Sequence, residues 1–180
     1  MKFYPYPPLP RISGKYQEAL KTYDELLRMS REIKDLELEA DSHSMLSETY
    51  EEYGEFISES LAHLTQQYEI VKSNSLKSPL LMAKLGYNIT ERYRLLHDVS
   101  KALDYGNETL NHGLKAGTEA GDTVALVHTS FGRVHLYCGD LAKAEESFKV
   151  GTNTTLNIFF QKRLVTVIVT MRTKIFLIHF

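Results

Sequence analysis

The sequence lacks several features that mark common classes of protein. It has no tryptophan and a single cysteine, Cys138, so no disulfide can form within one chain. Its first ten residues, MKFYPYPPLP, lack the apolar run of a secretory signal. Together these observations predict a reducing compartment. The three N-x-T triplets, which begin at Asn88, Asn107 and Asn153, are therefore interpreted as chance rather than as glycosylation sites.

Motifs for catalysis and for metal or cofactor binding are also missing. The seven histidines are dispersed, with no HExxH and no close Cys/His set. A glycine series at Gly113, Gly117 and Gly121 lacks the preceding strand and the Lys-Ser/Thr of a phosphate-binding loop, so it predicts the end of one helix and a break before the next. No motif surrounds a serine or cysteine nucleophile. We expect a protein that is not an enzyme and that uses no cofactor and no metal.

What the sequence does contain is an internal repeat. With 180 residues, 43% hydrophobic content and a net charge of −2, the chain is long enough for one soluble globular core. The segment GDLAKA, followed by Phe148, resembles HDVSKA, GEF with a later serine, and GKYQEA followed by Tyr23. These segments begin at residues 14, 54, 97 and 139, which are spaced by 40, 43 and 42 residues. Periods of this length are typical of repeat architectures.

Each repeated segment stands between two helical patterns, so the repeating unit is predicted to be a helical hairpin. Apolar residues recur at helical spacing before and after Gly139, at Leu126, Phe131, Val134, Tyr137, Leu141, Ala144 and Phe148. Gly132 leaves room for a neighbouring helix. Glycine suits the turn because it adopts a positive φ, and the acidic residue after it favours the next helix's N-terminus. Where His97 replaces this glycine, we expect a turn of a different kind.

This spacing resembles the tetratricopeptide repeat in a long variant of about 40 residues. The signature places of the last unit hold Phe131, Gly132, His135, Gly139, Ala144 and Phe148; those of earlier units hold Leu46, Tyr50, Gly54, Ile89, Tyr93 and Ala102. The departures are His135 for a common tyrosine, Gly106 for a common aromatic residue, and the missing tryptophan and terminal proline. The resemblance implies an all-α fold, a solenoid of helical hairpins with non-repeat ends.

A narrower resemblance covers residues 14–151. The segments GKYQEALKTYDELLRMSREIKDLELEADSH and SLAHLTQQYEIVKS are similar to the first tetratricopeptide repeats of Tonsoku-like proteins, which are scaffolds of replication-fork repair. The resemblance implies a nuclear location and partners among fork-repair factors, histones and histone chaperones. Histone recognition in that family is assigned mainly to ankyrin repeats. This chain has no ankyrin or leucine-rich repeats, so the resemblance also implies a fragment or a short isoform.

Both ends depart from the repeat. Residues 1–13 form a proline-rich leader that is expected to be disordered, with PPLP as a possible ligand for a WW-type groove. The first unit of the array, residues 14–151, is therefore half a hairpin, whose helix over 15–34 buries a stripe of Tyr16, Ala19, Tyr23, Leu27 and Ile33. Residues 152–180 form a tail with four basic and no acidic residues, whose apolar run is too short to span a bilayer. The tail is interpreted either as a helix that caps the open end of the solenoid or, preferably, as the product of an alternative or mispredicted transcript end.

Charge is distributed unevenly along the chain. Residues 32–59 hold ten acidic residues against the single Lys34, a net −9, so the remainder carries +7. If Leu46 packs as in tetratricopeptide repeats, the concave groove of the array is lined by Asp41, Glu48, Glu51, Glu52, Glu91, Arg94 and Arg133. An ordinary solvated helix face explains the acidic residues equally well. We expect that changing Glu48, Glu51 and Glu52 to lysine abolishes partner binding without loss of helix, and that changes at Glu32, Glu37 and Glu39 matter less.

The predicted function is a non-enzymatic scaffold that binds a protein partner, with a basic segment of that partner in the groove. By resemblance this scaffold belongs to a replication-fork repair complex in the nucleus; the alternative is a cytoplasmic or cortical adaptor. A second alternative is an array that attaches to a membrane surface through the basic, apolar tail. No direct nucleic-acid partner is predicted, and a membrane is not expected.

Overall fold

The protein is an all-α solenoid of helical hairpins, as the repeat predicts. The computed structural model describes residues 16–52, 56–74 and 78–178, with side chains up to residue 159. Within this part of the chain there is no strand. The helices are α1 (Tyr16–Ile33), α2 (Leu36–Glu52), α3 (Ile57–Ser73), α4 (Pro79–Leu95), α5 (Val99–Ala116), α6 (Gly121–Tyr137) and α7 (Leu141–Ile178), with a short 3-10 helix, η2 (Gly117–Ala120), after α5. The leader and the repeat anchors Gly14 and Gly54 lie outside the described residues.

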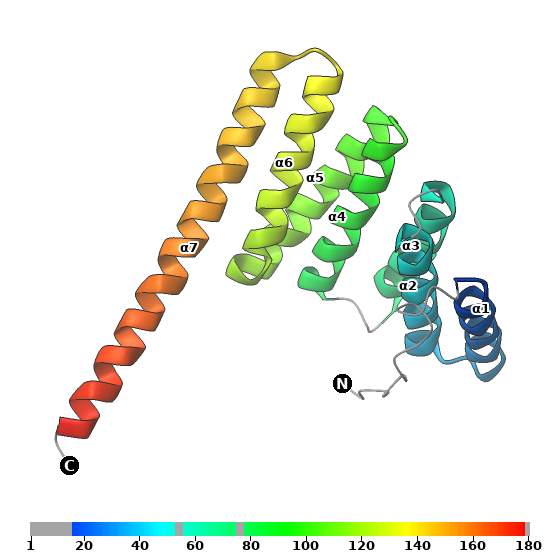
Figure 1. Cartoon of the computed structure of the whole chain (residues 1–180), viewed down its shortest axis with the longest axis horizontal. Helices are drawn as coiled ribbons and strands as arrows, with labels where there is room; N and C mark the ends of the chain where they lie inside the picture. Colours follow the sequence, from blue (N-terminus) through cyan, green and yellow to red (C-terminus); the bar gives the residue numbers. More distant parts are fainter. Residues whose placement is uncertain (1–15, 53–55, 75–77, 179–180) are drawn as a thin grey trace.

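The helices pack in chain order. The hairpins α2–α3, α4–α5 and α6–α7 stand side by side, and α1 packs on α2 as the remaining half of the first unit. Successive hairpins also touch through their first helices, since α4 packs against α6. Figure 1 shows that the row is not straight: α1 to α3 and the far half of α7 lie lower than the middle of the stack. The array is therefore arched.

Two apolar clusters hold helices α1 to α4 together. One joins α1 to α2 through Ala19, Tyr23, Leu27 and Leu46. The larger cluster joins α2, α3 and α4 through buried residues that include Ala40, Tyr68, Val71, Met82 and Ile89. Each fully buried large aliphatic side chain contributes about 1.5 to 3 kcal/mol, so both clusters add substantially to the stability of the stack.

The turns that join α4 to α5 and α6 to α7 have the same backbone conformation. His97 and Gly139 both have positive φ, 60° and 77°, so the expectation of a different turn at His97 is wrong. In each turn the following aspartate, Asp98 or Asp140, accepts a hydrogen bond at the helix N-terminus, from the backbone N–H of Lys101 (3.2 Å) or of Lys143 (3.1 Å). The His97 ring stacks on Tyr137, with centroids 4.5 Å apart. That contact offsets the strain of a non-glycine residue in this conformation.

The conformation of Gly139 gives a stability prediction. A Cβ added there would meet no atom within 4 Å, so only the backbone conformation opposes a side chain. Gly139→Ala should lower the free energy of unfolding by about 1 to 2 kcal/mol, as measured by urea denaturation. The matched variant His97→Gly removes the same strain at the equivalent turn and should change stability by less than about 1 kcal/mol. An unaltered midpoint for Gly139→Ala would contradict the positive φ.

Close packing uses glycine where helices approach. A Cβ at Gly106 of α5 would lie 2.2 Å from the Phe131 ring of α6, and one at Gly132 of α6 would lie 2.6 Å from the Phe148 ring of α7. An aromatic residue of the next unit thus fills the space over Gly106, where tetratricopeptide repeats commonly have an aromatic residue of their own. The predicted role of Gly132 is confirmed.

The prediction of the apolar stripes was partly wrong, because several of their residues are exposed rather than buried. Ala19, Tyr23, Leu27, Phe131, Val134 and Ala144 are buried, but Ile33, Leu126, Tyr137 and Leu141 are exposed, Ile33 by 65% and Leu141 by 69%. Small and polar residues such as Ser130 and Thr123 take buried places on α6 instead. An apolar residue near a helix end or at the open end of a stack has no neighbour to cover it, and periodicity alone does not show this.

Helix α7 crosses the predicted boundary after Gly151 without interruption. Its 38 residues correspond to a length of about 57 Å, roughly twice that of α6. Ile158 still packs on α6, since a Cβ at Gly121 would lie 2.6 Å from its side chain. Figure 1 shows the last part of α7 projecting beyond the other helices. In the described part of the chain, no helix is both long and apolar enough to cross a membrane.

Candidate functional site

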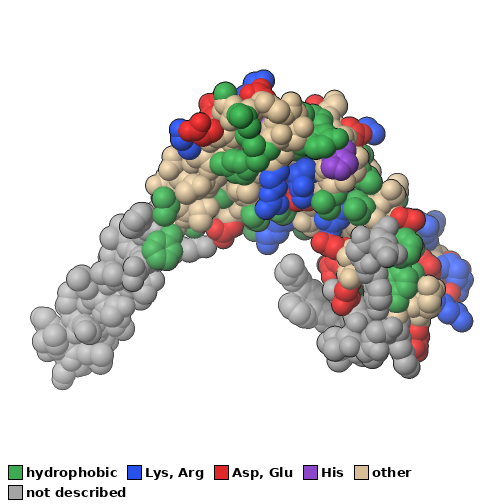
Figure 2. All heavy atoms as spheres, turned by 45° about the horizontal axis from the view of Figure 1, so that its top comes forward, with side chains coloured by type: hydrophobic (Ala, Val, Ile, Leu, Met, Phe, Trp, Pro, Cys, Tyr) green, Lys and Arg blue, Asp and Glu red, His purple; other side chains and the backbone are tan. Residues whose placement is uncertain are grey.

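Charged side chains collect at the middle of the arch. Figure 2 shows Lys and Arg side chains gathered there, above the hollow between the two sides of the molecule, with acidic side chains among them. The first helices of the hairpins carry different charges. Helix α2 has six acidic residues and no Lys or Arg, whereas α4 has Lys84, Arg92 and Arg94 against the single Glu91.

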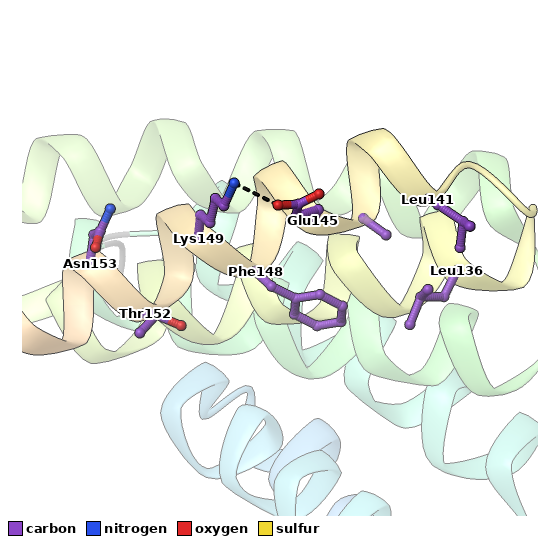
Figure 3. Close-up of a pocket in the computed structure, with 8 residues that line it drawn as sticks. Leu136, Leu141, Glu145, Phe148, Lys149, Thr152 and Asn153 are labelled. Carbon is purple, nitrogen blue, oxygen red and sulfur yellow. Dashed lines mark ion pairs between the residues drawn. The ribbon is translucent and has the colours of Figure 1, made fainter.

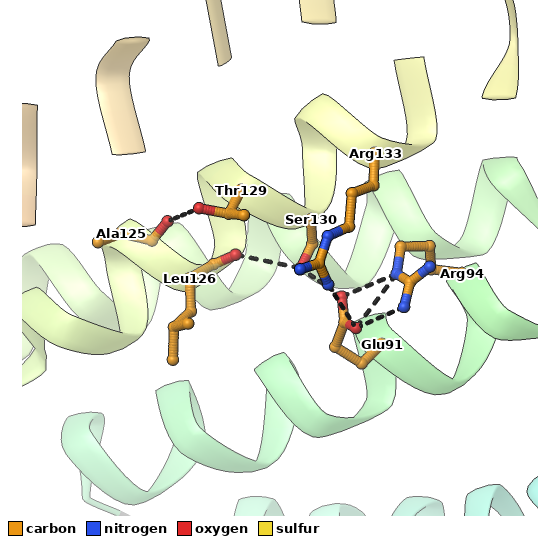
Figure 4. A network of polar contacts seen from close by, with 7 residues as sticks. All are labelled: Glu91, Arg94, Ala125, Leu126, Thr129, Ser130 and Arg133. Carbon is orange, nitrogen blue, oxygen red and sulfur yellow. Dashed lines mark hydrogen bonds and ion pairs between the residues drawn. The ribbon is translucent and has the colours of Figure 1, made fainter. Parts of the chain in front are cut away.

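Glu91 is the centre of a polar cluster that links α4 to α6 (Figure 4). Arg94, one helical turn away, donates to both of its carboxylate oxygens, at 2.8 to 3.1 Å. From α6, the Ser130 hydroxyl donates to the same carboxylate, and an Arg133 nitrogen lies 3.8 Å from it. The structure therefore brings together three of the predicted groove residues, and Ser130 joins them.

The environment keeps Glu91 ionised. Burial acts to raise the pKa of Glu91, but the hydrogen bonds from Arg94 and Ser130 and the charges of Arg94 and Arg133 together lower it below its ordinary value. With one carboxylate and two guanidinium groups, the cluster has a net positive charge. Arg133 is held least tightly, since its side chain is 54% exposed.

A buried arginine, which the sequence analysis missed, joins α4 to the preceding hairpin. Arg92 is only 7% exposed. It forms an ion pair with Glu51 of α2 and donates a hydrogen bond to the Ser60 hydroxyl of α3 at 3.2 Å. The Ser60 hydroxyl also shares a hydrogen bond with the Ser47 hydroxyl of α2. These groups border a cavity of about 210 Å³ whose walls include Tyr50 and Leu95. No sequence signal distinguishes Arg92 from the neighbouring Arg94. Arg92 is buried because it packs against small serine side chains of the preceding hairpin.

The other predicted acidic residues lie along α2. Asp41 is half-buried, and burial, followed by the charges of Glu37 and Asp35, raises its pKa. Glu48 and Glu52 are exposed, and Glu48 accepts from Ser44 at 3.3 Å. The structure thus divides the predicted residues into an acidic surface, formed by Asp41, Glu48, Glu51 and Glu52, and the positive Glu91 cluster.

Glu51 is unsuitable for the predicted charge-reversal test, because it is the ion-pair partner of Arg92. A lysine at this position would place a cation beside buried Arg92 and remove its ion-pair partner. Breaking a buried ion pair costs about 3 to 5 kcal/mol, and less when one partner is exposed as Glu51 is. The triple change at Glu48, Glu51 and Glu52 would therefore alter stability as well as binding.

A pair of histidines forms a second cluster, between α2 and α3. His43 Nδ1 and His63 Nδ1 are 2.9 Å apart, and Arg31 Nη2 lies 3.4 Å from His43 Nε2. Arginine can only donate, so neutral His43 accepts at Nε2 and donates from Nδ1 to His63. Across the described residues, no group of three or more His, Cys, Asp or Glu side chains could hold a metal ion. The two rings pack against each other, with centroids 5.2 Å apart.

The histidine pair predicts loss of stability in mild acid. Burial, followed by the charges of His63 and Arg31, lowers the pKa of His43 from 6.5 to about 4, and burial lowers that of His63. Unfolding raises both values, so the unfolded chain binds more protons and stability falls as the pH drops from 6.5 towards 4. His43 alone contributes on the order of 3 kcal/mol of this loss.

Urea denaturation across this pH range tests the prediction. The variant His43→Gln cannot take up the proton, so its unfolding free energy should depend less on pH than that of the parent protein. An unchanged slope between pH 6.5 and the onset of carboxylate titration would exclude the pair as the cause.

Comparison with known proteins does not assign the chain to a family. No protein-family model matches the sequence, and no curated protein matches it.

Proposed function

We propose that the chain is a non-enzymatic scaffold of the tetratricopeptide type, which binds an extended segment of a partner protein along the first helices of its hairpins. The observation that carries this proposal is the change of charge along those helices. An acidic surface on α2 and the positive Glu91 cluster on α4 and α6 belong to one continuous stack, in which the Glu51–Arg92 ion pair joins α2 to α4. Repeat arrays use such extended surfaces to bind linear segments.

The charge order defines the partner. A segment that is basic at one end and acidic at the other complements both surfaces, whereas a uniformly basic segment complements only α2. Charges arranged in this way select the partner and its direction more than they raise affinity. The sequence resemblance supports a fork-repair complex in the nucleus as the setting, and a cytoplasmic or cortical adaptor has the same surface requirements.

Peptide binding tests the proposal. The probe is a labelled peptide of about 20 residues, with lysines in one half and glutamates in the other; the control contains the same residues in alternation. The block peptide should bind the full chain at least about tenfold more tightly, measured by fluorescence anisotropy. Added salt should weaken binding, because exposed charges are screened over about 8 Å at physiological ionic strength. Equal affinities for the two peptides would remove the charge order from the mechanism.

A further inference from the structure

An apolar groove lies at the open end of the stack, on the outer side of α6 and α7 (Figure 3). It has a volume of about 470 Å³. Its walls include Leu136, Leu141, Ala144 and Phe148, with the Glu145–Lys149 ion pair at its edge. Leu136 is 48% exposed and Leu141 is 69% exposed, which is unusual for large apolar side chains lying side by side.

The preceding unit shows what covers this face when the stack continues. Asp98 and Asp140 begin equivalent helices, so positions 42 residues apart correspond. On the α4–α5 hairpin the equivalent face is occupied by α6. The Phe131 ring of α6 fills the space over Gly106, and Ser130 and Arg133 approach Glu91. The groove on α6–α7 is the same interface moved forward by one unit.

The residues at the corresponding positions have changed in size and charge. Phe148 stands where Gly106 stands one unit earlier, so the groove already holds an aromatic ring and needs a small residue opposite it. Arg133, which is not one of the groove's wall residues, stands in the place of Glu91. Its side chain lies 3.8 Å from Glu91 but is largely exposed, so the residue that faces it from a docked helix should be acidic. Leu136 replaces Arg94, which makes the end of the groove beside Leu141 apolar.

We propose that this groove is a docking site for one amphipathic helix of a partner protein. That helix lies across α6 and α7 as α6 lies across α4 and α5. Its contact face carries a small residue against Phe148 and an acidic residue against Arg133. The site is separate from the acidic surface of α2, but it shares Arg133 with the Glu91 cluster.

A second copy of the chain is the competing occupant. On its α1, the exposed Glu25 and Glu32 form ion pairs with Arg28 of the same helix, whereas Asp24 is also exposed and acidic. The oligomeric state of the unliganded protein therefore distinguishes a partner helix from self-association.

The chain itself supplies a probe for the test. A stapled peptide with the sequence of α6, residues 121–137, and the changes F131A and R133E has the predicted small and acidic residues. Fluorescence anisotropy with the full-length protein should show binding. A peptide with F131A alone should bind at least about tenfold more weakly.

Three protein variants locate the binding site. Leu141→Glu puts a charge in the groove and should weaken binding at least about tenfold, whereas the matched variant Leu114→Glu, at an exposed leucine of α5, should not. Arg133→Glu should reverse the preference, so that the peptide with F131A alone binds better. Absence of binding, or equal effects of the two leucine variants, overturns the proposal. A dimer of the unliganded protein that Leu141→Glu dissociates would overturn it in favour of self-association.

Discussion

Gly106→Leu should destabilise the stack by on the order of 4 kcal/mol, because a side chain there must displace a buried ring. Even a Cβ at Gly106 would lie 2.2 Å from Phe131 Cε1, and Phe131 is 8% exposed. A small domain has only about 5 to 15 kcal/mol of stability in total, so the change should be evident in urea denaturation.

A second substitution distinguishes steric conflict from an intrinsic need for glycine. Phe131→Ala vacates the space over Gly106, so Gly106→Leu in that background should cost little or should stabilise. Leucine is also the better helix former, by nearly 1 kcal/mol. Gly106→Leu could instead lower the free energy of unfolding equally in the presence and absence of Phe131. Position 106 would then require glycine for a reason other than the contact between α5 and α6.

Glu48→Lys combined with Glu52→Lys should weaken binding of the block peptide roughly 100-fold, because two carboxylates that face its basic half become cations. Both residues are exposed, and this pair of changes leaves the Glu51–Arg92 ion pair in place. Helical content, measured by circular dichroism, and the urea midpoint should therefore change little.

The matched control reverses two acidic residues elsewhere. Glu25→Lys with Glu32→Lys alters the net charge by the same amount on α1, where both residues are exposed. It should reduce affinity only slightly, through the overall charge. Similar losses in the two double variants would mean that total charge, rather than the acidic surface of α2, attracts the peptide.

The fold could be predicted from the sequence because its repeat is encoded locally. Asp98 and Asp140 begin helices through their own side chains, and Gly132 marks a close helix contact, so a 42-residue spacing was enough to define the hairpin. The turn at His97 was mispredicted because its stabilising partner, Tyr137, belongs to another unit. A similar turn at Lys34, with φ of 56°, joins α1 to α2 and was missed, since lysine carries no turn signal.

The candidate site was predictable only in part. Helical spacing placed Glu91 and Arg94 on one face, and the repeat period brought Arg133 to the same place. The burial of Arg92 depends on Ser47 and Ser60, which come from two other helices, so no local pattern reveals it. The histidine pair likewise joins residues 20 positions apart on different helices.

Paramagnetic relaxation in the complex tests most directly whether a partner segment follows the charge order of the array. The block peptide carries a nitroxide at its basic end in one sample and at its acidic end in another. We expect the basic-end label to broaden amide signals of α2, near Glu48 and Glu52, and the acidic-end label to broaden those near Arg94 and Arg133. The same signals broadened from both ends, or broadening confined to other helices, would contradict a segment bound in one direction along the stack.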